Sequence, residues 1–230
     1  MLCLQEHHLL DHSLNLLFSL STQHDIFAVP ATPTGCRPSS GIVNILPKSL
    51  NGTILATDTN YFACSFSSIV LSNCYFPNDY HDDISFDAFT QCCFNLVRFV
   101  SSLKSNFRTY ILGNFNCDSN IANEWGTVLS SCVHNFSVLP KSQDYSYINW
   151  SDNTTNIDHV FSSNPSYPLP VVIVIEDFPV SDHMPLHFVL PPLPSHPSPV
   201  RISGNKLPKF FDWVDWSRNF RPLYQEKLRL

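Results

Sequence analysis

Five short segments of the sequence place acidic, amide or imidazole side chains directly beside a stretch with the composition of a β-strand. In chain order they are Leu4-Gln5-Glu6-His7-His8, Asn73-Cys74-Tyr75-Phe76-Pro77-Asn78-Asp79, Gly113-Asn114-Phe115-Asn116, Asn156-Ile157-Asp158-His159 and Ser181-Asp182-His183-Met184-Pro185. Strand ends can converge on one rim of a sheet, and the sheet keeps the groups there rigid. One Asp-His pair alone is usually a surface turn, but five such segments in order indicate a single site.

The charge of the chain is unevenly distributed. Residues 201–230 contain seven Lys or Arg and three Asp or Glu, a net +4, whereas residues 1–200 contain six and sixteen, a net −10. General affinity for nucleic acid comes from neutralising phosphates, so such an acidic body is a poor generic binder. If the body acts on a phosphodiester, a bound cation must offset part of its acidity. The charge therefore favours metal chemistry over a basic binding patch.

The hydrophobic pattern predicts strands that alternate with helices. Short β-branched runs predict strands at 42–45, 54–57, 69–75, 110–112, 157–161, 171–175 and 186–190. From Phe86 to Leu103, apolar residues recur at spacings of three and four, which predicts a helix over about 85–103. Weaker helix candidates cover 14–20 and 123–134. This order of elements favours an α/β sandwich with buried sheets.

Composition divides the chain into a domain at 1–190, a Pro-rich linker at 191–200 and a basic, aromatic tail at 201–230. In the tail, Trp213, Trp216 and Phe220 are spaced either to pack as one face of a helix or to stack on bases. No apolar run approaches the roughly 18 residues that span a membrane. The N-terminus has no basic leader, and the eight cysteines show no framework spacing. We therefore expect an intracellular protein, cytoplasmic or nuclear, with reduced thiols.

In order and spacing, the five segments resemble the endonuclease/exonuclease/phosphatase superfamily, which includes apurinic-site endonucleases and pancreatic deoxyribonuclease. The family pattern is a QE at a strand end, an N-x-Y-x-P segment, a G-D-x-N segment, an I-D-[HY] segment and a terminal S-D-H-x-P. The resemblance covers roughly residues 1–190 and is closest to the endonuclease domain of LINE-type retrotransposons. It implies a sandwich of two mixed β-sheets flanked by helices, and a tail similar to the connector to a reverse transcriptase.

The resemblance also implies a divalent cation and a DNA substrate. Glu6 would ligate the cation, and Asp182 would complete the metal site or orient the attacking water. Hard oxygen ligands suit Mg²⁺ or Mn²⁺, and Mg²⁺ keeps several waters and leans on one or two carboxylates plus substrate phosphate. The implied activity is metal-dependent hydrolysis of a phosphodiester by in-line attack of water.

Other positions would handle the phosphate and the water. His183 would contact the scissile phosphate, with Asp158 holding its imidazole in one tautomer. Tyr75 would donate to a phosphate oxygen, Asn116 would position the nucleophile or the phosphate, and Ser181 would orient its own turn.

Two departures from the family pattern matter. The aspartate of the G-D-x-N segment, held to accept the proton of the water or fix it for attack, is Asn114 here. Loss of a positioned general base typically costs about 10²–10⁴ in rate, so we expect impaired catalysis. Family members also begin with an asparagine-bearing strand well before the QE segment, whereas Met1 lies five residues before Glu6. We therefore expect the domain to lack that strand.

Several alternatives stay open. His7 and His8 beside Glu6 are compatible with zinc, although adjacent histidines rarely converge on one ion. Asp79, Asp82 and Asp83 fit a solvated loop that caps the long helix better than a second metal cluster. For function, the alternatives to a weakened or inactive endonuclease are a non-catalytic remnant that binds a partner, and a phosphatase of another superfamily branch.

Overall fold

The computed structural model describes residues 1–19, 22–34, 38–78, 82–103, 107–118, 121–149, 151–163, 171–175 and 181–190. The chain divides into two compact units, Met1–Leu193 and Pro194–Leu230, and every described residue belongs to the first. The expected linker at 191–200 and tail at 201–230 therefore lie outside the described residues.

A six-stranded mixed sheet forms the middle layer of the first unit. Its strands, in spatial order, are β4 (Thr53–Thr57), β5 (Tyr61–Phe66), β6 (Ile69–Tyr75), β7 (Arg108–Asn114), β11 (Asp158–Ser162) and β8 (Ser137–Val138). Strands β6 and β7 are parallel, and the other neighbours are antiparallel. The parallel pair is connected by α2 (Asp83–Ser102), because parallel strands need a crossover of this kind.

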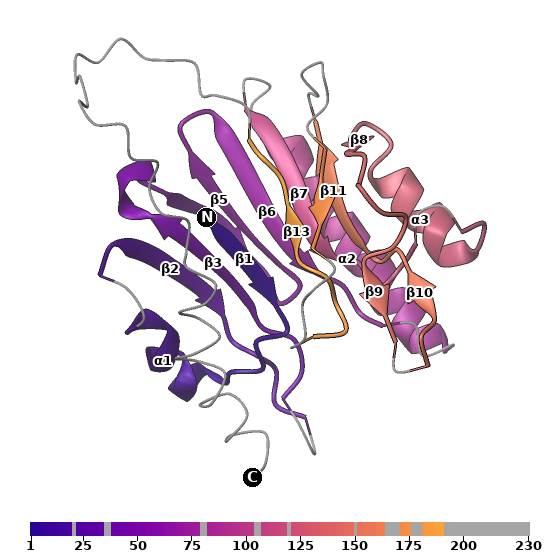
Figure 1. Ribbon diagram of the computed structural model, residues 1–230, viewed down its shortest axis with the longest axis horizontal. Coiled ribbons are helices and arrows are strands. Elements are labelled where there is room, and N and C mark those ends of the chain that lie inside the picture. Colours follow the sequence, from indigo (N-terminus) through magenta and orange to yellow (C-terminus); the bar gives the residue numbers. More distant parts are fainter. Residues whose placement is uncertain are drawn as a thin grey trace. The chain divides into compact units, whose positions relative to one another are not determined.

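A smaller antiparallel sheet lies on one face of the six-stranded sheet, and helices lie on the other face (Figure 1). The smaller sheet has the order β1 (Leu2–Gln5), β3 (Ile42–Pro47), β2 (His24–Val29). The helical layer consists of α2 and α3 (Glu124–Cys132). Short elements complete the unit: η1 (Asp11–Ser13), α1 (Asn15–Phe18), η2 (Lys48–Leu50), the β9–β10 pair (Tyr147–Ile148, Thr154–Thr155) and the β12–β13 pair (Ile173–Val174, Leu186–His187).

Two hydrophobic clusters hold the layers together. Phe62, Cys64 and Phe66 of β5 belong to the cluster between the two sheets, whereas Tyr61 and Ala63 belong to the cluster under the helices. This division follows from the alternation of side chains along a strand. Both faces of β5 are therefore buried, as in a three-layer α/β fold.

The predicted sandwich is confirmed, and most predicted elements coincide with observed ones. The helix expected over 85–103 is α2, which begins where the Asp82 side chain accepts from Ser85 N at 2.6 Å. The candidates at 14–20 and 123–134 contain α1 and α3. Strands β2 and β5 and the two-residue strands β8, β9 and β10 were not predicted. No helix of the described residues is long and apolar enough to cross a membrane.

A buried amide network joins the two sheets. Asn73 on β6 has no exposed surface, and its Nδ2 donates to Leu4 O (3.2 Å), Val43 O (3.2 Å) and Asn44 Oδ1 (2.8 Å) of the smaller sheet. Its Oδ1 accepts from Gln5 Nε2. These bonds hold the end of β1, and hence the adjoining Glu6, against β6.

We predict that Asn73→Leu lowers the free energy of unfolding by about 3 kcal/mol, because the side chain keeps its size but leaves several buried polar groups without a partner. Urea denaturation measures the change. Asn153→Ala, at an exposed position, is the matched control and should stay within about 0.5 kcal/mol of the wild type. An equally small change in Asn73→Leu would show that the network does not join the sheets.

Candidate functional site

The site is built on the register of three adjacent strands. Tyr75, the last residue of β6, pairs with Asn114, the last residue of β7, and Asn114 in turn pairs with Asp158, the first residue of β11. All three residues are at most 8% exposed. The sheet thus places three of the predicted site residues in one row at one edge.

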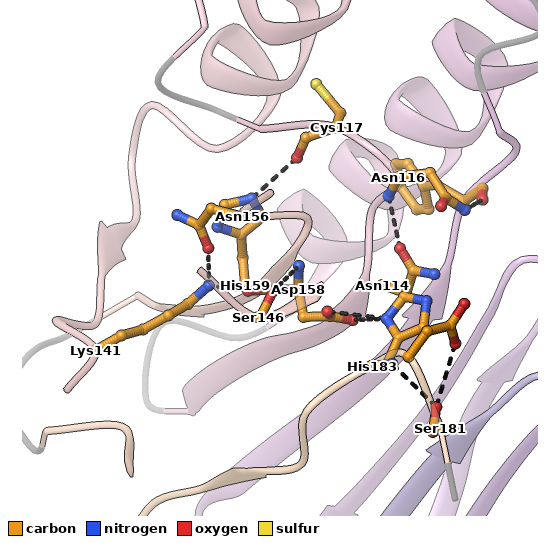
Figure 2. Close-up of polar contacts among 12 residues, drawn as sticks. Asn114, Asn116, Cys117, Lys141, Ser146, Asn156, Asp158, His159, Ser181 and His183 are labelled. Atoms are coloured by element: carbon orange, nitrogen blue, oxygen red, sulfur yellow. Dashed lines mark hydrogen bonds and ion pairs between the residues drawn. The ribbon is translucent and has the colours of Figure 1, made fainter. Parts of the chain in front are cut away.

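Asp158 is hydrogen-bonded to His183, the contact that the resemblance implied. The two carboxylate oxygens of Asp158 lie 3.2 and 3.0 Å from Nδ1 of His183, which precedes β13 (Figure 2). Burial lowers the pKa of His183, but the hydrogen bond and the charge of Asp158 outweigh that effect, and the net pKa is raised above its ordinary value. The pair therefore favours an imidazole that carries a proton and a positive charge more readily than a free histidine.

The turn after β7 holds the two asparagines in place. Asn114 Oδ1 accepts from Asn116 N at 2.7 Å, and Asn116 Nδ2 donates to Phe76 O at 2.7 Å. Asn116 has a φ of 50°, which asparagine tolerates better than most residues. Figure 2 shows Asn114 and Asn116 above the Asp158–His183 pair. Asn114 therefore preserves a folded turn at this position.

Gly113 is required by the approach of β7 to β6. Its φ is +138°, and a Cβ at this position would lie 2.0 Å from the backbone oxygen of Cys74. No side chain fits there without separating the two strands. The glycine that precedes Asn114 in the G-N-x-N segment is thus explained by backbone contact.

Glu6 and Asp182 supply carboxylates near His183. Glu6 directly follows β1, and its charge and that of Asp182 both act on His183 and on Tyr147. Ser181 Oγ accepts from His183 N at 3.0 Å and lies 3.5 Å from Asp182 Oδ1, so it orients its turn. Within the described residues, no group of three His, Cys, Asp or Glu side chains is arranged to hold a metal ion. The two expected ligands, Glu6 and Asp182, are hard carboxylates, which would fit a cation that keeps several waters.

The neighbouring histidines and aspartates have structural contacts. His7 Nε2 lies 3.1 Å from Val29 O, and His8 Nδ1 lies 2.9 Å from Pro38 O. Both imidazoles therefore hold the loop after β1. Asp82 caps α2, and Asp79 lies outside the described residues.

Sequence reasoning missed Lys141, which contacts the backbone of Asp158 in this row. Its Nζ donates to Asn156 Oδ1 and to the backbone carbonyl of Asp158 (Figure 2). Burial lowers the pKa of Lys141 to about 8, although the charges of Asp158 and Asp118 act in the opposite direction. The available signal was compositional, since Lys141 is one of only six basic residues in 1–200.

His159 shares this buried environment. It has no exposed surface, and its Nε2 lies 3.0 Å from Cys117 O. Burial, and then the charge of Lys141, lowers its pKa to about 4. Next to Asp158, the chain thus holds a neutral imidazole in the core.

Comparison with solved structures confirms the fold. An AP endonuclease from Archaeoglobus fulgidus matches with a TM-score of 0.60 at 11% identity, over 81% of this chain and 87% of that one. A 3' phosphatase, NExo, from Neisseria, solved with a product DNA hairpin, matches with a TM-score of 0.55 at 16% identity, over 82% and 88%. Caenorhabditis elegans TDP2 matches with a TM-score of 0.55 at 13% identity, over 79% and 80%.

These structures have the endonuclease/exonuclease/phosphatase fold, and the described unit shares it. At these identities the likeness concerns the fold alone. No family model and no curated protein matches the chain.

We predict that His159 makes stability fall as the pH is lowered from about 6.5 to about 4. Its pKa is depressed in the folded state, so the unfolded chain takes up the proton first and the stabilisation, complete above 6.5, is lost on acidification. The largest slope for one such group is about 1.4 kcal/mol per pH unit.

Urea denaturation at several pH values, for the wild type and for His159→Gln, isolates this component. His134→Gln, at an exposed position, is the matched substitution. The difference in unfolding free energy between wild type and His159→Gln should shrink as the pH falls. A difference that is constant with pH would show that His159 is not held neutral.

Proposed function

We propose that this chain is a metal-dependent phosphodiester hydrolase domain of the DNA endonuclease type, with its turnover reduced by Asn114. The observation that carries the proposal is the row of Tyr75, Asn114 and Asp158 across three strands, with His183 bonded to Asp158. The fold is shared with an AP endonuclease and with a 3' phosphatase solved with a DNA hairpin. The order of the five segments supports derivation from a LINE-type retrotransposon.

In this proposal, His183 and Tyr75 bind the scissile phosphate. Asp158 holds the imidazole by Nδ1 and favours its charged form, so that Nε2 faces the phosphate as a charged donor. Asn116 is held by Phe76 O and orients the phosphate or the water. These groups are pre-positioned by strand ends, so little reorganisation is needed at the moment of reaction.

Glu6 and Asp182 would hold the cation, Mg²⁺ or Mn²⁺, which stabilises negative charge on the phosphate when it is bound. The cation would also offset part of the net −10 charge of residues 1–200. Carboxylates without a third protein ligand leave room for water and for phosphate oxygens. The two ligands thus suit a cation that is shared between protein and substrate.

Asn114 is the residue at which this chain differs from the family pattern of an efficient hydrolase. Its amide oxygen already accepts from Asn116 N, and a neutral amide takes no proton from water. The same observation favours a second candidate, a domain that binds its ligand without hydrolysing it.

The seven described cysteines are free thiols, which supports a reducing, intracellular location.

We predict that Asn114→Asp raises the rate of Mg²⁺-dependent nicking of supercoiled plasmid by about 10²–10⁴, because it restores a proton acceptor. Asn51→Asp, at an exposed position in the left-handed region, adds the same charge and should leave the rate unchanged. Glu6→Gln in the Asn114→Asp background should abolish the gain.

Two outcomes would contradict these statements. If the wild type nicks as fast as Asn114→Asp, the role given to position 114 is wrong. If neither protein nicks and Mg²⁺ does not raise the melting temperature of either, the hydrolase proposal fails and the non-catalytic candidate replaces it.

A further inference from the structure

Tyr147 lies outside the five segments but contacts His183 at the site. It is the first residue of β9, a two-residue strand paired with β10. Its backbone forms an antiparallel bridge with His183. On either side of the bridge, Ile148 N donates to Asp182 O at 2.9 Å, and Met184 N donates to Ser146 O at 2.8 Å. The loop that carries Asp182 and His183 is therefore held in register by the backbone of β9.

The side chain of Tyr147 contacts both site residues of that loop. Its ring centroid lies 4.8 Å from that of the His183 imidazole, with the planes tilted by 58°. Burial, the charge of Asp182 and a hydrogen bond to the Asp182 side chain raise the pKa of Tyr147, which is consistent with a hydroxyl directed at that carboxylate. One side chain thus restrains an imidazole through its ring and a carboxylate through its hydroxyl.

Ser146, the residue before Tyr147, restrains Asp158, the other member of the Asp158–His183 pair. Ser146 is fully buried, and its Oγ accepts from Asp158 N at 3.0 Å. The dipeptide Ser146-Tyr147 therefore contacts both Asp158 and His183, which are 25 residues apart in the chain. An imidazole held at Nδ1 by a carboxylate can still rotate or tilt about that bond. The ring of Tyr147 against its face removes this freedom.

We propose that Tyr147 is a positioning residue, whose ring sets the His183 imidazole and whose hydroxyl orients the Asp182 carboxylate. The part that concerns Asp182 rests on the proposed function, because Asp182 and Glu6 are the proposed cation ligands. Groups that orient metal ligands typically contribute about 10–100-fold to metal affinity or activity. If Tyr147 only packed against its neighbours, the loss of its hydroxyl from a half-buried ring would change neither Asp182 nor His183.

The first test uses Tyr147→Phe, which removes the hydroxyl and keeps the ring. In the full chain, we expect Mn²⁺ affinity, measured by titration calorimetry, to fall about 10-fold or more. The ¹³Cγ resonance of Asp182 should shift, whereas the ¹⁵N resonances of His183 should stay as in the wild type. Tyr145→Phe, two residues away, removes an equivalent hydroxyl and should change none of these quantities.

The second test uses Tyr147→Leu, which also removes the ring. At alkaline pH, where imidazole is neutral, the ¹⁵N resonances of His183 should change from those of one tautomer, with the proton on Nδ1, to those of a mixture. A melting temperature close to that of the wild type shows that the variant is folded. If Tyr147→Leu is unfolded, Tyr147→Trp, which keeps an aromatic face without the hydroxyl, should retain the His183 resonances while shifting that of Asp182.

The outcomes separate this inference from the proposed function. An unchanged Asp182 resonance in Tyr147→Phe overturns the role of the hydroxyl, and unchanged His183 resonances in folded Tyr147→Leu overturn the role of the ring. If the wild type binds no Mn²⁺ and hydrolyses nothing, the proposed function fails. The resonances of Asp182 and His183 still decide whether Tyr147 positions them, because neither measurement needs metal or turnover.

Discussion

The contact between Gly113 and the backbone of Cys74 determines the register on which the site depends. Because a Cβ at position 113 would lie 2.0 Å from the Cys74 oxygen, β6 and β7 approach each other in a way that only glycine allows. This parallel pairing aligns Tyr75 with Asn114, and the antiparallel pairing of β7 with β11 aligns Asn114 with Asp158. A slip of one residue in either pairing would turn these side chains to the opposite face of the sheet. The site is thus a consequence of strand register first and of loop conformation second.

The acidity of the chain and the chemistry of its core are connected. Three acidic side chains, Glu6, Asp158 and Asp182, act on His183, and the half-buried amine of Lys141 donates to the backbone carbonyl of Asp158. Lys141 in turn helps to keep His159 neutral, because two cations so close together would repel each other. The protein therefore raises the pKa of the imidazole at the rim and lowers the pKa of the one in the core. One of these histidines is hydrogen-bonded to the Asp158 carboxylate, and the other follows Asp158 in sequence.

The parts of the fold that the sequence predicted are those with a local signal. Helix α2 was predicted because its apolar residues recur at helical spacing, and β6 because it is a run of apolar and β-branched residues. Strand β5 was not, because it contains no β-branched residue and its burial on both faces comes from parts of the chain that are distant in sequence. The same division applies to the site. Asp158 and His183 were named from the family-like segments, whereas Ser146, Tyr147 and Lys141 act through contacts that no local spacing indicates.

Asn114 separates what the scaffold needs from what turnover needs. An amide matches a carboxylate in shape, and its oxygen still closes the turn by accepting from Asn116 N. The row of strand ends, the Asp158–His183 pair and the amide network around Asn73 therefore form without a carboxylate at position 114. Under the proposed function, an amide at this position costs the fold little, whereas the missing proton acceptor would add about 3–5 kcal/mol to the barrier of hydrolysis. Selection for folding alone would thus leave the site geometry intact, and a well-formed site is evidence of the fold before it is evidence of an active enzyme.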